Sequence, residues 1–210
     1  FSHAVNQGIA IAKGEYMALF NNDAFAEPTW LAELLRTAEA DPKIFAVSSL
    51  MLRYYEPELA DDAGDYVTIL GFACKRGDGL KARRYTKPCR VFSACGGAAL
   101  YRKSILDEIG VFDELFFAYY EDVDLSWRAN NFGYRNVYCP TARCRHICGH
   151  NRCGAVQSVQ EHPERTEQHP AALQEPADFD VGFEFYPDAA GVSAQSAYVP
   201  AARLRRGGYR

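Results

Sequence analysis

The sequence predicts an α/β layered domain in which helices flank a mostly parallel sheet. Segments with apolar residues at helical spacing alternate with short apolar runs, in the order helix, strand, helix, strand over the first 50 residues. Hydrophobic residues make up 48% of the 210 residues, which is enough to build a sizeable core. No apolar run approaches the roughly 18 residues that a membrane-spanning helix needs.

Each element follows from its local pattern. Apolar side chains three to four positions apart predict the helices, and proline or glycine near a helix end fits its first turn or its cap. Short apolar runs predict strands, and the run at 15–20 is expected to be buried. In chain order we expect a helix at 2–13, a strand at 15–20, a helix starting near Pro28, strands at 44–50, 91–94 and 98–101, helices at 104–109 and 121–131, and a last strand at 135–139.

The composition divides the chain near residue 148. Residues 1–147 are expected to form the domain, and within them 53–88 reads as a long excursion over the surface with one hairpin. The segment 148–210 contains no Ile, Met or Trp and only two leucines, Leu173 and Leu204. Because it can bury little apolar surface, this tail is expected to be disordered, and a shifted reading frame is one hypothesis for its origin.

Three carboxylates lie close together after an aromatic run. Glu121, Asp122 and Asp124 begin a predicted helix directly after 116–120, FFAYY. Carboxylates at a helix N-terminus complement its dipole, which explains one or two acids better than three. Since an unpaired charge avoids apolar surroundings, the alternative is a site that binds a cation or accepts a proton.

Two further motifs leave alternatives open. Asn21-Asn22-Asp23 follows a strand, where it is either a polar turn or a source of oxygen ligands for Mg²⁺ or Mn²⁺. Gly96-Gly97 is either a turn that needs positive φ or a close approach of the backbone to a ligand.

The net charge of −4 and the pI near 5.8 argue against a general nucleic-acid binder. The spacing of the Cys and His residues between 139 and 153 matches no common zinc site.

Taken together, these segments resemble family 2 glycosyltransferases with the GT-A fold, and in particular the rhamnosyltransferase-like bacterial members. The resemblance covers roughly residues 1–146. It includes the segments FSHAVNQGIAIAKGEYMALFNND, DDAGDYVTILGFACKRGDG and CGGAALYRKSILDEIGVFDELFFAYYEDVDLSWR. In this family the first strands and the loop that holds the nucleotide base would precede Phe1, so the resemblance implies a GT-A sheet that is incomplete at its N-terminus.

The resemblance implies a donor side for the site. Asn21-Asn22-Asp23 corresponds to the family's DxD-type motif in the donor loop, with Asn at its first position. Asp23 and the late histidine, His146, would be the protein ligands of a divalent cation, Mg²⁺ or Mn²⁺.

The resemblance also implies an acceptor side. Asp122 would be the general base and Glu121 would orient or contact the acceptor. Gly96-Gly97 would lie under the donor and acceptor sugars, and Asp124 and Trp127 would bind the acceptor.

The implied activity is inverting, metal-assisted transfer of a sugar from a nucleotide-diphosphate-sugar to a hydroxyl of a glycan or lipid-linked acceptor, in cell-surface polysaccharide biosynthesis. No nucleic-acid partner is expected. The implied location is the cytoplasm, with peripheral association at the inner face of the membrane. The alternative is a chain without catalytic activity, either a truncated remnant or a sugar-binding module.

Overall fold

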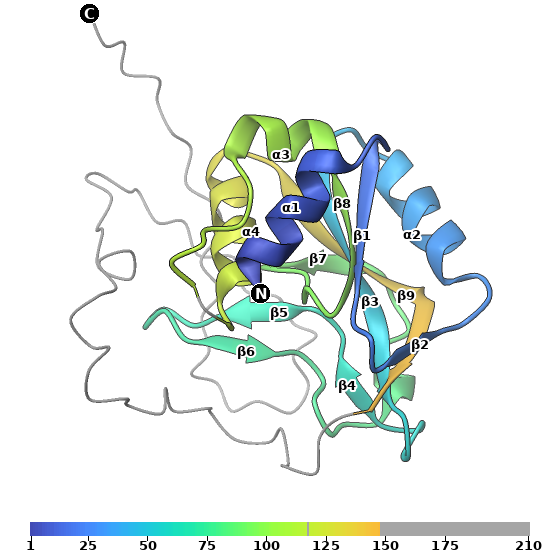
Figure 1. Cartoon of the computed structure of the whole chain (residues 1–210). Coiled ribbons are helices and arrows are strands. Elements are labelled where there is room, and N and C mark those ends of the chain that lie inside the picture. The colour runs from blue at the N-terminus through green and yellow to red at the C-terminus, as the bar shows by residue number, and fades with distance from the viewer. Residues whose placement is uncertain (117, 148–210) are drawn as a thin grey trace, which may run out of the picture.

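A computed structural model describes residues 1–116 and 118–147 of the chain. These residues form helices and strands throughout (Figure 1). In order they are α1 (Ser2–Ile11), β1 (Tyr16–Phe20), β2 (Ala24–Ala26), α2 (Trp30–Glu39), β3 (Ile44–Arg53), β4 (Ala60–Asp62), β5 (Asp65–Val67), β6 (Ala73–Lys75), the 3₁₀ helix η1 (Ala82–Arg84), β7 (Cys89–Val91), β8 (Ala98–Arg102), α3 (Lys103–Ile109), α4 (Glu121–Asn131) and β9 (Arg135–His146).

The central sheet has the strand order β1-β8-β3-β9-β2, with β4 paired to β3 and β7 paired to β9. β3 and β9 are parallel, and β8 lies antiparallel between β1 and β3. The three strands β1, β3 and β9 therefore run in one direction, as expected, but the sheet as a whole is mixed. The α-helix α2 provides the crossover between β1 and β3, whereas residues 54–97, all of them described, contain no α-helix that could return the chain for a parallel pairing.

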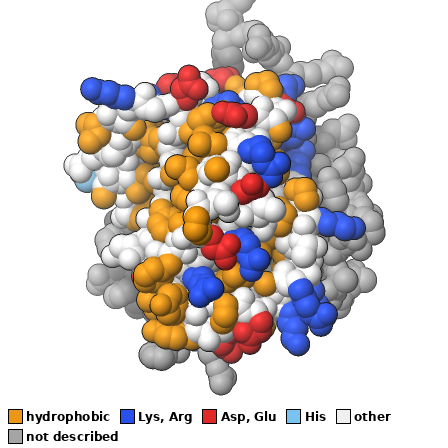
Figure 2. Space-filling model, turned by 90° about the vertical axis from the view of Figure 1, so that its right-hand side faces the viewer, with side chains coloured by type: hydrophobic (Ala, Val, Ile, Leu, Met, Phe, Trp, Pro, Cys, Tyr) orange, Lys and Arg blue, Asp and Glu red, His pale blue; other side chains and the backbone are white. Residues whose placement is uncertain are grey.

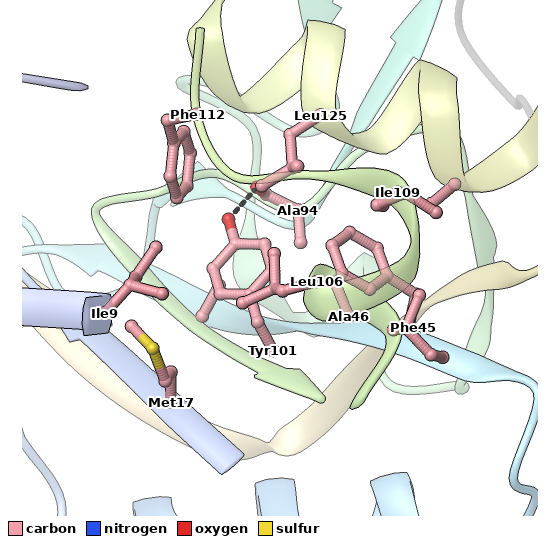
Figure 3. Close-up of a cluster of buried hydrophobic side chains, with 13 residues drawn as sticks. Ile9, Met17, Phe45, Ala46, Ala94, Tyr101, Leu106, Ile109, Phe112 and Leu125 are labelled. Carbon is pink, nitrogen blue, oxygen red and sulfur yellow. Dashed lines mark hydrogen bonds between the residues drawn. The ribbon is translucent and has the colours of Figure 1, made fainter. Parts of the chain in front are cut away.

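Helices cover both faces of the sheet, which confirms the α/β class (Figure 1). Alternate residues of a strand point to opposite faces. Ala99 and Tyr101 of β8 therefore pack in the cluster that contains residues of α1, α3 and α4, while Ala98 and Leu100 pack with α2. In the first cluster, shown in Figure 3, the buried Tyr101 hydroxyl donates a hydrogen bond to the Ala94 carbonyl (3.0 Å).

Several predicted elements are confirmed and some boundaries move. α4 spans the predicted residues, and α1 begins where predicted but ends two residues earlier, at Ile11. The last strand is longer than predicted, because it continues beside β3 as far as His146. The strand expected at 91–94 lies earlier, because β7 begins at Cys89 and ends at Val91. The prediction of a buried strand at 15–20 is wrong in one respect: β1 ends the described sheet, and only Met17 of this strand is buried.

The excursion after β3 is not a surface loop throughout, which corrects the interpretation of residues 53–88. The hairpin β5–β6 is present as predicted. β4, however, pairs with the end of β3. Ala60 of β4 and the following Ala63 pack with Leu52 and Tyr138 in a buried cluster. This pairing draws the polar residues between them into the interior.

The predicted tail, residues 148–210, lies outside the described residues, as does Phe117 of the aromatic run. Among the helices that the structure describes, none is long and apolar enough to cross a membrane. Figure 2 views the molecule from the side on which α2 and β2 lie in Figure 1, and shows hydrophobic side chains interspersed with charged side chains of both signs.

Candidate active site

The glycine pair joins two of the predicted motifs. The backbone amide of Asn21 donates a hydrogen bond to the Gly97 carbonyl (2.9 Å), so the loop after β1 lies against the loop before β8. A Cβ at Gly97 would lie 3.2 Å from Nδ2 of Asn21 and 3.4 Å from Cε of Met51. Neither Gly96 nor Gly97 has a positive φ. Gly97 therefore allows a close approach, here to the Asn21 side chain, and neither glycine serves a positive-φ turn.

Asp122 is attached to the other side of the same loop. The Gly96 amide donates to Oδ2 of Asp122 (2.8 Å), and the Val123 amide donates to Oδ1 (2.8 Å). These two bonds fix the carboxylate at the start of α4. The structure thus brings Asn21, Gly96, Gly97 and Asp122 together, although they come from three segments far apart in the sequence.

The surroundings of the acidic pair change its protonation. Burial raises the pKa of Asp122, and the backbone donors Gly96 and Val123 offset only part of this effect. Burial, followed by the charge of Asp122, also raises the pKa of Glu121, which is 7% exposed. Burial therefore opposes the helix dipole, which by itself would favour the ionised form of a carboxylate at the N-terminus of α4.

The backbone that leads into α4 is unusual. Tyr119 and Tyr120 both adopt the left-handed conformation, with φ of 69° and 68°. A non-glycine residue in this region costs on the order of 1–3 kcal/mol, and such residues cluster at active sites. The sharp turn they form places Glu121 and Asp122 at the very beginning of the helix.

Asp23 and His146 meet at one end of the sheet. Ala24 of β2 pairs with His146 of β9, and the Ile147 amide donates to the Asp23 carbonyl (2.9 Å). Nε2 of His146 lies 3.2 Å from Oδ1 of Asp23, and Nδ1 lies 2.8 Å from Oδ2 of Asp61. The hydrogen bond with Asp61 is the main reason that the pKa of His146 is raised, and the charge of Asp23 adds to it.

This pair offers an oxygen and a nitrogen ligand from adjacent side chains. Within the described residues, no group of three or more His, Cys, Asp and Glu side chains is arranged to hold a metal ion. A cation that is bound by one or two protein ligands and completes its shell with substrate phosphates and water is typical of Mg²⁺ sites in enzymes that act on nucleotides. Asp23 and His146 therefore fit an open cation site of this kind and do not fit a closed structural one.

Three buried aspartates were not predicted as site residues. Asp61 and Asp62 are 0% exposed and Asp65 is 7% exposed. Burial raises the pKa of Asp62 to about 7, and it raises the pKa of Asp65 well above its ordinary value. The charge of Asp122 contributes to both shifts, so Asp62 and Asp65 lie within electrostatic range of the predicted base. Their sequence signal was the acidic run in 61–65, but the expectation of a surface excursion concealed its burial.

The remaining predicted acceptor residues have structural contacts. Asp124 accepts a hydrogen bond from Nε of Arg128 (3.0 Å), whose guanidinium also donates to the carbonyls of Ile109 and Val111. The Trp127 ring packs edge-on against Phe92 (5.3 Å between centroids) and is 43% exposed. Binding of an acceptor by Asp124 and Trp127 stays a prediction.

Comparison with known proteins identifies relatives of the chain. Over 56 residues, 27% of the chain, the sequence is 41% identical to an N-acetylglucosaminyl-diphospho-decaprenol L-rhamnosyltransferase from Mycobacterium tuberculosis. It is 31% identical over 146 residues, 64% of the chain, to the O-antigen biosynthesis protein RfbC from Myxococcus xanthus. The chain covers 18% and 11% of the lengths of these two relatives.

The fold also matches a solved structure. The crystal structure of GalNAc-T7 with UDP, GalNAc and Mn²⁺ aligns with 70% of the chain and 30% of its own length, at 17% identity and a TM-score of 0.57. The family model described as glycosyl transferase family 2 matches residues 1–110, which is more than half of the chain. This protein therefore belongs to glycosyl transferase family 2.

Proposed function

We propose that the chain is the catalytic part of an inverting glycosyltransferase that moves a sugar from a nucleotide-diphosphate-sugar to a hydroxyl acceptor. One observation carries the proposal. The glycine loop holds Asn21 of the donor loop on one side and the carboxylate of Asp122 on the other, through the Gly97 carbonyl and the Gly96 amide. A donor at the loop after β1 would therefore lie within reach of a base.

In this proposal each residue has a distinct role. Asp122 accepts the proton of the acceptor hydroxyl as that oxygen attacks the anomeric carbon. Glu121 orients the acceptor, and Asp23 and His146 hold a divalent cation, Mg²⁺ or Mn²⁺. When bound, the cation neutralises the diphosphate as it leaves.

The relatives support the substrate classes. The mycobacterial relative is named for a lipid-linked acceptor, the myxobacterial one for O-antigen biosynthesis, and the GalNAc-T7 crystals contained UDP and Mn²⁺. We infer that the acceptor of this chain is a glycan or a lipid-linked sugar and that its product enters a bacterial cell-envelope polysaccharide.

Release of nucleoside diphosphate tests the function. The purified chain is incubated with a panel of nucleotide-diphosphate-sugars and Mn²⁺, with and without EDTA. We expect cation-dependent release from at least one donor, and Asp23→Ala should remove most of the cation dependence because an anionic ligand next to the diphosphate is lost. Binding of a donor without release would favour the sugar-binding module. Release that EDTA and Asp23→Ala leave unchanged would show that Asp23 is only a turn residue.

We also propose that the chain works in the cytoplasm, associated peripherally with the inner face of the membrane. Support comes from the tip of the β5–β6 hairpin, where Ile69, Leu70 and Phe72 are 59%, 77% and 51% exposed. Apolar side chains of this kind can enter the lipid interface. In co-sedimentation with anionic vesicles, we expect Leu70→Ser to lower the bound fraction. Leu115→Ser, at an exposed site outside the hairpin, is the control, and equal binding of all three proteins would contradict the proposal.

A further inference from the structure

Asp61 contacts the ring of His146 from the interior of the protein. Its side chain is 0% exposed, and its Oδ2 lies 2.8 Å from Nδ1 of His146. The other ring nitrogen, Nε2, lies 3.2 Å from Oδ1 of Asp23. The imidazole is thus placed between a buried carboxylate and the carboxylate of the donor loop.

From this geometry we infer that Asp61 is the positioning residue of His146: it binds Nδ1–H, fixes the tautomer of the ring and presents the Nε2 lone pair toward Asp23. The inference rests on the proposed function, in which Nε2 and Asp23 hold the cation. The two nitrogens of a neutral imidazole have opposite roles, so the nitrogen that donates to a carboxylate determines which one is left as a ligand. Histidines that bind metals are commonly oriented in this way.

The backbone makes Asp61 suited to this task. β4 pairs with β3 through Met51 and Asp62, and β9 pairs with β3 through Arg53 and His146. Both partners of the hydrogen bond are therefore attached to the same end of one central strand. The ammonium of Lys75 lies 3.6 Å from Oδ1 of Asp61, which compensates its buried charge.

Asp65 provides a matched comparison. It is a buried carboxylate on β5, the next strand along the chain. It accepts a hydrogen bond from the Ser93 hydroxyl (2.9 Å) and not from His146. If the interior only requires carboxylates in this region, Asp61→Asn and Asp65→Asn should have similar effects. If Asp61 positions His146, only Asp61→Asn should change the ring.

The first measurement needs no variant of Asp61. Long-range ¹H–¹⁵N correlation spectra of the ¹⁵N-labelled chain report which ring nitrogen carries the proton, and His146→Gln assigns the signal among the five histidines. In the neutral ring we expect the proton on Nδ1. A neutral ring with its proton on Nε2 would overturn the inference, whatever the variants do.

The second measurement compares Mn²⁺ binding, followed by electron paramagnetic resonance. Asp61→Asn should weaken binding by about 10- to 100-fold, the usual effect of removing a residue that orients a metal ligand, and should mix the ring tautomers. Asp65→Asn should leave the tautomer of His146 unchanged. Equal effects of the two variants on the tautomer and on Mn²⁺ binding would overturn the inference. An Nδ1–H ring in a wild-type chain that binds no Mn²⁺ would support the positioning role and count against the proposed function alone.

Discussion

Asp122→Asn is expected to abolish sugar transfer while donor binding stays nearly intact. Asparagine keeps the size of the side chain and an oxygen that can accept from the Gly96 amide, but it is not a base. Loss of a general base lowers the rate by about 10²- to 10⁴-fold. The measurement is the rate of transfer to an acceptor, together with titration calorimetry of the donor.

Asp107→Asn is the control, because it removes a carboxylate from the exposed surface of α3. Transfer by Asp122→Asn within tenfold of wild type, a difference of about 1.4 kcal/mol in activation free energy, would reject Asp122 as the base. The rate should also fall as the pH is lowered, because the base becomes protonated. Since burial raises the pKa of Asp122, this fall should begin at a higher pH than the ordinary pKa of an aspartate would give.

Asp62→Asn should remove a loss of stability that the wild type shows as the pH rises from 5 to 8. Burial raises the pKa of Asp62 from 3.8 to about 7, so between these values the folded chain keeps a proton that the unfolded chain releases. The free energy of unfolding of the wild type therefore falls as pH rises through this window, by roughly 4 kcal/mol at most. Asparagine does not ionise, so this contribution to the slope disappears. Urea unfolding at pH 5, 6, 7 and 8 measures it.

The exposed substitution Asp107→Asn serves as control here as well, since its carboxylate lies in solvent and should not flatten the slope. Parallel pH dependences for the wild type and Asp62→Asn would show that Asp62 is ionised in the folded protein. In that case the Lys75 ammonium compensates the charge more fully than the burial suggests.

Local patterns were sufficient for most of the helices and for several strands. The helix Glu121–Asn131 was predictable because its acidic start and its glycine at 133 mark both ends. Of the two alternatives for Gly96-Gly97, the positive-φ turn is wrong, and Asp23 and His146 lie side by side as the resemblance implied.

Long-range pairing determined what the sequence could not show. The acids at 61–65 follow no apolar periodicity, so nothing local indicates that β4 pairs with the end of β3 and buries them. The left-handed backbone of Tyr119 and Tyr120 has no signal either, because tyrosine seldom adopts it. The reversed direction of β8 depends on how a long excursion returns to the sheet, which apolar runs do not specify.

The central claim is that Asp122 activates an acceptor hydroxyl for a single displacement at the anomeric carbon. The anomeric configuration of the product tests it most directly, read from the coupling of the anomeric proton by NMR after transfer from a donor of known configuration. A single displacement predicts a product whose configuration is inverted relative to the donor. A product that retains the donor configuration would contradict the claim, because a single displacement with attack opposite the leaving group inverts the anomeric carbon.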